Sequence, residues 1–230
     1  MKKLWLLLYY GLVPLLFWAF LYDESVFLKK AGFLEVVSNL ILITYYIRYK
    51  NSKFVLIDWY SIEALLFTCA GGILILIFRD LHLLMFLNTV GFYLTQFMYI
   101  SIFRDEGSIL PPFSSVIKEW KMIFLTILFF IGLVFLLITY TPNSLLLISF
   151  VYSTQMMVLC WMAYFRPIPR KAYSMGFIGI FLLVMSNLWL AINLLYKELP
   201  YKTGVYFIIY ATSQLLIIES ILYTRNKVEN

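Results

Sequence analysis

The chain has 230 residues, of which 63% are hydrophobic and 13% charged, and a net charge of +6. A soluble domain is about half apolar and about a quarter charged, so this composition excludes an ordinary water-soluble fold. Apolar runs of about 18 residues or more approach the ~20 residues that cross a hydrocarbon layer about 30 Å thick. The sequence therefore predicts several membrane-spanning helices.

The order of the apolar runs predicts an all-α polytopic bundle of about eight transmembrane helices, forming a single domain over residues 1–230. The first run begins like a secretory signal but has no small-residue cleavage site, so we interpret it as a helix. The second run is the shortest and carries Glu35, Ser38 and Asn39, and it either crosses the bilayer fully or re-enters from one side. The expected spans are residues 4–21, 33–47, 58–78, 83–103, 122–140, 144–165, 174–196 and 205–223.

The basic residues indicate the orientation of the bundle, because Lys and Arg gather on the cytoplasmic side of membrane proteins. With eight spans, thirteen of the 18 basic residues fall on the side that holds both termini. We therefore expect both termini in the cytoplasm, in a bacterial cytoplasmic membrane. These residues lie in short loops beside helix ends, where anionic lipid headgroups are the natural partner, and this argues against nucleic acid as a partner. The sequence does not indicate a protein partner.

The sequence offers few conventional motifs. Cys69 and Cys160 both fall inside apolar runs, where a lone thiol behaves as a small buried hydrophobe. A Ser/His/Asp set, a phosphate-binding glycine loop and a Cys/His metal pattern are all missing from the sequence. We expect neither a cofactor nor a metal.

Polar side chains within the predicted spans are the first candidates for function, because they are costly in hydrocarbon and tend to face the bundle interior. Glu63 and Glu219 are carboxylates at similar depth near the cytoplasmic ends of their spans. If they meet, one carboxyl can act as a general acid. The alternative is that each is protonated or hydrogen-bonded at a helix contact, or reaches the interface.

Gly72 and Asn187 lie at similar distances from the cytoplasmic starts of two spans that run in the same direction. A rise of ~1.5 Å per residue puts them at a similar depth, beyond the middle of the bilayer. A likeness between the third and fourth spans and the seventh and eighth favours a site between the two halves of the bundle.

Two stretches of sequence carry a family resemblance. Residues 65–72 read LLFTCAGG and residues 96–99 read QFMY, while residues 186–191 read SNLWLA and residues 213–216 read SQLL. They resemble the two signatures of the YhhN or lysoplasmalogenase-like family of membrane proteins. The first signature is roughly L-F-S-x-x-G-D followed by F-x-x-x-H-x-x-Y. The second is roughly S-D-S-x-L-A followed by Y-x-x-A-Q-L-L.

The resemblance implies hydrolysis of the vinyl-ether bond of lysoplasmalogens, with the two motif aspartates as the catalytic pair. An acid protonates the enol-ether carbon, and a base activates water. In this sequence the aspartate positions are Gly72 and Asn187, and the motif histidine is Gln96. Neither glycine nor an amide exchanges a proton near neutral pH. We therefore expect the family fold without the family's usual reaction.

The leading functional hypothesis is an intramembrane cavity that holds a lysophospholipid or another amphiphile without hydrolysing it, lined by Gln96, Ser186, Asn187, Asn193 and Gln214. Two alternatives stay open. An active lysoplasmalogenase-type hydrolase would use other carboxylates, namely Glu63, Glu219 or Asp58. A transporter or a subunit of a membrane complex would use small and aromatic helix faces as partner surfaces.

Overall fold

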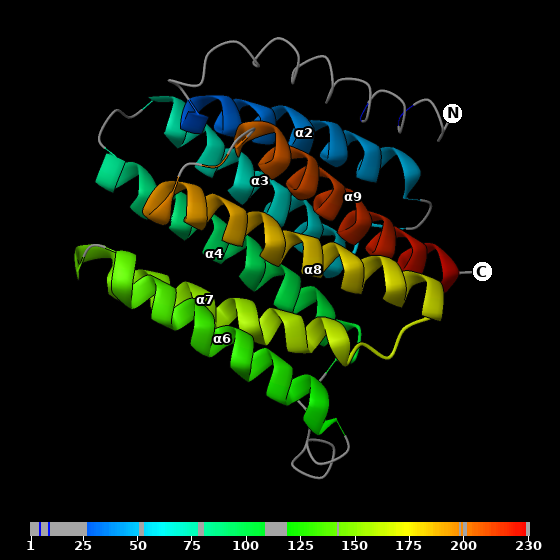
Figure 1. Cartoon of the computed structure of the whole chain (residues 1–230). Helices are drawn as coiled ribbons and strands as arrows, with labels where there is room; N and C mark the ends of the chain where they lie inside the picture. The colour runs from blue at the N-terminus through cyan, green and yellow to red at the C-terminus, as the bar shows by residue number, and fades with distance from the viewer. Residues whose placement is uncertain are drawn as a thin grey trace.

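Long helices run side by side to form the bundle in Figure 1. The computed structural model describes residues 5, 9, 27–50, 53–77, 81–108, 119–141, 143–197, 199 and 202–228. Within them lie seven α-helices and the π-helical turn η2, which continues α8: α2 (Phe27–Tyr49), α3 (Leu56–Ile77), α4 (Leu81–Asp105), α6 (Trp120–Tyr140), α7 (Asn143–Tyr164), α8 (Arg170–Ala191), η2 (Ile192–Tyr196) and α9 (Lys202–Val228).

The prediction of an all-helical fold is confirmed for the described residues. The second to eighth expected spans each overlap one of these helices. The expected first span, residues 4–21, lies outside the described residues apart from Trp5 and Tyr9. The count of eight spans and the orientation of the termini stay predictions.

Helix α2 differs in length from the expected second span, because it covers 23 residues rather than the segment 33–47. At ~1.5 Å per residue it extends about 34 Å. Its polar side chains do not interrupt it, since Glu35 and Asn39 are 1% and 0% exposed. They face neighbouring helices, and this explains how a polar segment stays helical among apolar ones.

Helices α2 and α9 run parallel. The Asn39 amide donates to the Tyr210 hydroxyl at 2.8 Å, and the Asn226 amide donates to the Tyr49 carbonyl at 3.1 Å. In contrast, α8 and α9 run antiparallel, with the Ser220 hydroxyl 2.7 Å from the Ala172 carbonyl. These contacts fix which residues of α2, α8 and α9 share a level along the bundle.

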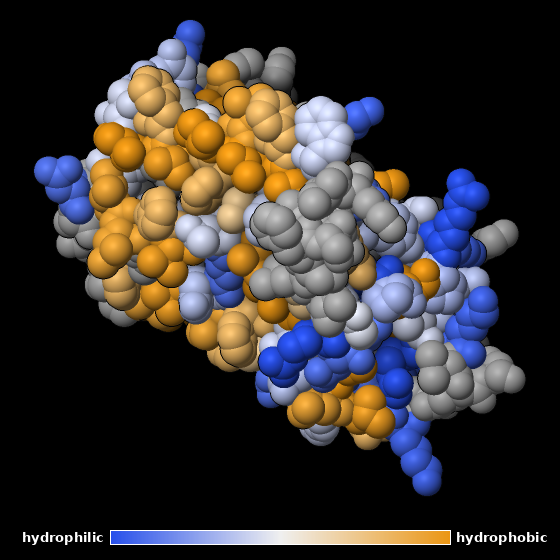
Figure 2. All heavy atoms as spheres, turned by 90° about the horizontal axis from the view of Figure 1, so that it is seen from below, coloured by the Kyte–Doolittle hydropathy of each residue, from blue (hydrophilic) through white to orange (hydrophobic). Residues whose placement is uncertain are grey.

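The outer surface of the bundle suits a membrane. Within the described residues, three helical segments are long and apolar enough to cross one: Leu56–Leu74, Arg170–Ala191 and Gly204–Lys227. Helix α6 adds a row of exposed apolar side chains, among them Phe124, Leu128 and Phe135. Figure 2 shows apolar residues spread over much of this face, with hydrophilic residues gathered towards one end. The protein is therefore a helical membrane protein.

Two buried ion pairs lie near the ends of these helices. Lys50 Nζ lies 2.7 Å from Asp58, and the Arg166 guanidinium lies 2.5 Å from Glu106. Burial raises the pKa of the Glu106 carboxyl, and the Arg166 charge opposes that shift. The Arg166 guanidinium also donates to the Ser220 hydroxyl at 3.1 Å. These pairs join α2 to α3 and tie the turn after α4 to the segment between α7 and α8, with a further bond to α9.

Candidate functional site

Polar side chains from four helices meet inside the bundle and form what we call the polar cluster. Every member is fully buried except Tyr152, which is partly exposed. The members come from α2, α4, α7 and α9: Glu35, Asn39, Gln96, Tyr99, Tyr152, Tyr206, Tyr210 and Gln214.

The contact between α2 and α9 supplies the first half of the cluster. The Tyr206 hydroxyl donates to the Glu35 carboxylate, and the Asn39 amide donates to the Tyr210 hydroxyl at 2.8 Å. Residues four apart on a helix lie on one face, so two such pairs on parallel helices form two consecutive rungs. The Tyr206 and Tyr210 rings stack with centroids 5.8 Å apart.

Helices α4 and α7 supply the second half. The Tyr99 hydroxyl donates to Gln214 Oε1 at 2.5 Å, and this bond ties α4 to α9. The Tyr152 hydroxyl of α7 lies close enough to Gln96 and to Glu35 to interact with both. It nevertheless makes no hydrogen bond of good geometry with any described residue. Tyr152 therefore faces the cluster, but its hydroxyl does not pair with the other polar atoms there.

Several buried polar atoms of the cluster have no hydrogen-bond partner among the described residues. They are Glu35 Oε2, Asn39 Oδ1, Gln214 Nε2, the Tyr152 hydroxyl, and both the oxygen and the nitrogen of the Gln96 amide. A buried polar group left unpaired costs about 1–3 kcal/mol. Such a group usually points to a functional role or to a bound polar molecule.

At the first family-motif position, Gly72, the neighbouring helix α2 leaves no space for a side chain. A Cβ atom at this position would lie 2.7 Å from the Gly32 carbonyl oxygen and 2.9 Å from Val36 Cγ2, both on α2. Ordinary contacts of a Cβ begin near 3.4 Å. An acid cannot stand at position 72 unless the backbone of α2 moves away.

The second motif position, Asn187, directs its amide to its own helix. Asn187 Nδ2 and the Ser186 hydroxyl both donate to the Leu183 carbonyl, each at 2.8 Å. Such bonds to the preceding turn are the usual outlet for a polar side chain in the middle of a helix. They direct Ser186 and part of Asn187 to the backbone of α8 rather than to the polar cluster.

Gly72 and Asn187 nevertheless lie at nearly the same level as Glu35. Gly72 lies against Gly32 and Val36 of α2, three residues before Glu35 and one after it, and Glu35 bonds Tyr206. On α8, Gly179 lies against the Ser213 carbonyl of α9. Asn187 is eight residues or ~12 Å further along α8, and the antiparallel packing brings it to the level of Tyr206. This register agrees with the shared level of Gly72 and Asn187 expected from the sequence, while their depth in the bilayer stays a prediction.

The remaining candidate amides divide into two kinds. Asn193 lies in η2, where its Nδ2 donates to the Trp189 carbonyl at 2.7 Å and its Oδ1 accepts the Leu199 amide at 2.8 Å. Both ends of this amide are engaged in holding the end of α8. Gln96 and Gln214, in contrast, belong to the polar cluster. The structure therefore brings together only these two of the five residues expected to bind an amphiphile.

The carboxylates considered as alternative acids lie away from the cluster. Asp58 is fully buried. It forms an ion pair with Lys50 and accepts a hydrogen bond from the Tyr46 hydroxyl at 2.7 Å. Glu219 accepts the Tyr45 hydroxyl. Tyr45 is ten residues, or ~15 Å, along α2 from Glu35. Glu63 is partly exposed, and its carboxyl makes no hydrogen bond or ion pair with the residues that the structure describes.

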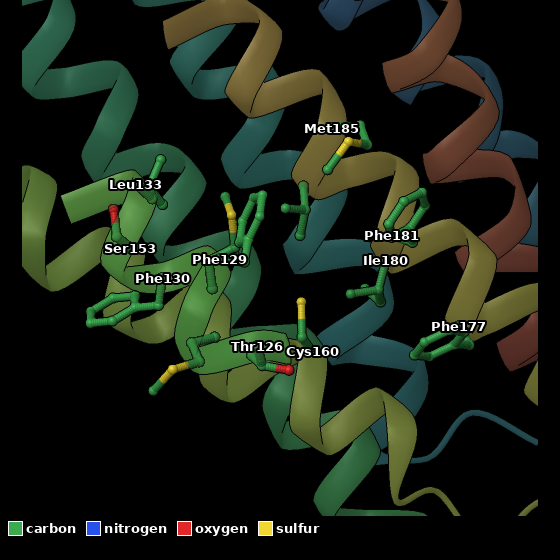
Figure 3. Close-up of a pocket in the computed structure, with 13 residues that line it drawn as sticks. Thr126, Phe129, Phe130, Leu133, Ser153, Cys160, Phe177, Ile180, Phe181 and Met185 are labelled. Carbon is green, nitrogen blue, oxygen red and sulfur yellow. The ribbon is translucent and has the colours of Figure 1, made fainter. Parts of the chain in front are cut away.

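An apolar groove lies between α6, α7 and α8. It encloses about 140 Å³ and is lined mainly by Phe, Leu, Ile, Val and Met side chains. Figure 3 shows the labelled side chains around it, with Phe129 on α6, Ser153 on α7 and Phe181 on α8. The Ser153 hydroxyl donates to the Ser149 carbonyl of its own helix. The groove therefore offers apolar walls and little polar chemistry.

Sequence reasoning missed most of the cluster. Glu35 and Asn39 stood out only as polar residues in a weak span. The useful signal was a pair of equal spacings, since Glu35 and Asn39 are four residues apart, as are Tyr206 and Tyr210. Among the described residues, no three His, Cys, Asp or Glu side chains gather as they would around a metal ion.

One comparison with known proteins identifies a family. The model of the YhhN family matches residues 32–221, which run from α2 to α9. No curated protein and no solved structure matches the chain.

Proposed function

The chain belongs to the YhhN family, and we propose that it binds a single-chain amphiphile inside its helical bundle without hydrolysing it. The observation that carries the proposal is the buried Gln96 amide, whose oxygen and nitrogen both lack a partner among the described residues. A side chain in this state gains stability from any polar group that reaches it. We place the protein in the bacterial cytoplasmic membrane, with both termini in the cytoplasm.

The absence of hydrolysis follows from the chemistry of the two motif positions. Gly72 has no side chain, and Asn187 is an amide that cannot donate and regain a proton near neutral pH. Since α2 occupies the space beside Gly72, a bound water molecule has little room to replace the missing acid. The apolar groove can receive a hydrocarbon chain.

The test is mass spectrometry of lipid retained after gentle detergent extraction. We expect the natural protein to retain a single-chain amphiphile and Gln96→Leu to lose it, because leucine fills the same volume without polar atoms. Asn187→Leu serves as a comparison and should retain more, since the Asn187 amide bonds α8 itself. Equal retention by the natural protein and Gln96→Leu would refute binding at the cluster. Stoichiometric co-purification of a second protein would instead favour a subunit of a membrane complex.

A second candidate function is hydrolysis by a relocated carboxyl. Glu35 lies at the level of the two motif positions, although it comes from α2 rather than α3. This candidate predicts that purified protein releases aldehyde from a lysoplasmalogen and that Glu35→Gln abolishes the release. The leading proposal predicts that neither protein releases aldehyde.

A further inference from the structure

We propose that the head group bound by the polar cluster is a neutral diol, as in a monoacylglycerol or monoalkylglycerol, and not a phosphate or an ammonium group. This inference rests on the proposed function and specifies the chemistry of the same site. It follows from matching the unpaired donors and acceptors of the cluster to each class of head group.

The cluster leaves both donors and acceptors unpaired. Asn39 Oδ1 is an acceptor and Gln214 Nε2 is a donor, while Glu35 Oε2 accepts when the carboxyl is ionised and donates when it is protonated. Turning the amide of Asn39 or Gln214 exchanges which of its atoms is free, but Gln96 leaves one donor and one acceptor in either orientation. A ligand that satisfies the cluster must therefore both donate and accept hydrogen bonds.

A phosphate group fits poorly. Its oxygens only accept, so the free oxygens of the Asn39 and Gln96 amides would stay unpaired beside it. Phosphate sites in proteins are normally built with Arg or Lys. None of the eight members of the cluster is basic.

An ammonium group can pair only with the free acceptors of the cluster. It can donate to Glu35 Oε2 and to the amide oxygens, but it cannot accept from Gln96 Nε2 or Gln214 Nε2. Both of these nitrogens would remain unpaired in the interior. The free oxygens of the cluster favour a group that donates, whereas the two amide nitrogens disfavour a group that only donates.

A diol can pair with both the free donors and the free acceptors, because each hydroxyl donates one hydrogen bond and accepts two. One hydroxyl can hydrogen-bond both atoms of the Gln96 amide group or one of them and the nearby Tyr152 hydroxyl. The other can reach the amide of Gln214 or Asn39. The hydrocarbon chain needs only apolar walls, and α7 carries Tyr152 of the cluster next to Ser153 of the apolar groove.

The experiment compares three probes that share an oleyl or oleoyl chain: 1-monooleoylglycerol, oleoyl lysophosphatidylcholine and oleylamine. The full-length protein is purified in detergent, and binding is measured by native mass spectrometry and by the shift in thermal unfolding. We expect 1-monooleoylglycerol to bind at least about tenfold more tightly than either other probe, which corresponds to about 1.4 kcal/mol.

The variants are Gln96→Leu and Glu35→Gln, and the matched control is Thr154→Val. Thr154 lies on α7 and its hydroxyl bonds the Phe150 carbonyl of its own helix, so the control removes a hydroxyl outside the cluster. We expect Gln96→Leu to weaken monooleoylglycerol binding at least about tenfold and Thr154→Val to leave it unchanged. Glu35→Gln keeps the volume of the site and provides a second reading if Gln96→Leu fails to fold.

The outcomes separate this inference from the proposed function. Tighter binding of lysophosphatidylcholine would overturn the diol assignment and leave amphiphile binding intact. Tighter binding of oleylamine that Glu35→Gln abolishes would assign a cation site instead. Failure of all three probes to bind would mean that the cluster holds water only, and both proposals would fall. Unchanged monooleoylglycerol affinity in Gln96→Leu and in Glu35→Gln would also refute the diol site.

Discussion

The lack of space beside Gly72 predicts how much stability a single added methyl group costs. In Gly72→Ala the new Cβ would lie 2.7 Å from the Gly32 carbonyl oxygen, about 0.7 Å short of an ordinary contact distance. The neighbouring atom belongs to the backbone of α2, so no side-chain rotation relieves the overlap. Overpacking of this kind costs about 1–3 kcal/mol.

Gly132→Ala provides the matched control. Gly132 lies in the middle of α6, and a Cβ there meets nothing within 4 Å. Alanine is favoured over glycine in a helix interior by about 1 kcal/mol, and both variants receive this gain. The difference between them therefore isolates the packing of α3 against α2.

The assay is thermal unfolding in detergent, followed by tryptophan fluorescence. We expect Gly132→Ala to be as stable as the natural protein or more stable. Gly72→Ala should unfold about 3–10 °C below Gly132→Ala, since 1 kcal/mol shifts the midpoint by about 2–4 °C in chains of roughly this size. Equal midpoints would refute the closure of position 72. In that case Gly72→Asp would become a direct test of restored hydrolysis.

Three further predictions concern the interior and the topology. Gln96→Leu should raise the free energy of unfolding of the ligand-free protein by about 1–3 kcal/mol, measured by denaturant titration, and a loss of stability would show that the Gln96 amide is satisfied. Arg166→Leu should cost about 3–5 kcal/mol because it leaves the Glu106 carboxylate buried and unpaired, whereas adding Glu106→Leu should recover part of that loss; equal costs for the single and double variants would exclude this pairing. Reporter tags fused to the two termini should both report the cytoplasm, and opposite reports would refute the expected count of eight spans.

The helices were predictable because the solvent dictates them. A chain in hydrocarbon must satisfy its backbone hydrogen bonds within each segment, and the apolar runs mark those segments directly. The boundaries of α2 were not predictable in the same way. Glu35 and Asn39 lower the hydropathy of the segment, but their burial against α9 removes the penalty.

The polar cluster was not predictable from the spans alone, because it depends on register between helices far apart in sequence. The bonds of Tyr206 to Glu35 and of Asn39 to Tyr210 cross 171 residues. Equal spacing on both helices permits these rungs, but it does not select α2 and α9 as partners. The choice of partner comes from packing, which sequence periodicity does not encode.

The same limit applies to the motif positions, and it changes what the substitutions mean. In the sequence, the resemblance to the family signature reads the glycine at position 72 as the loss of one carboxylate. In the structure, that glycine allows α2 to approach α3 closely, through Gly32 and Val36. The approach holds Glu35 near the level of Gly72. An aspartate at position 72 would have to push α2 outward and disturb the Glu35–Tyr206 contact. We therefore predict that Gly72→Asp combined with Asn187→Asp does not by itself release aldehyde from a lysoplasmalogen, because an acid at position 72 also needs room from changes on α2.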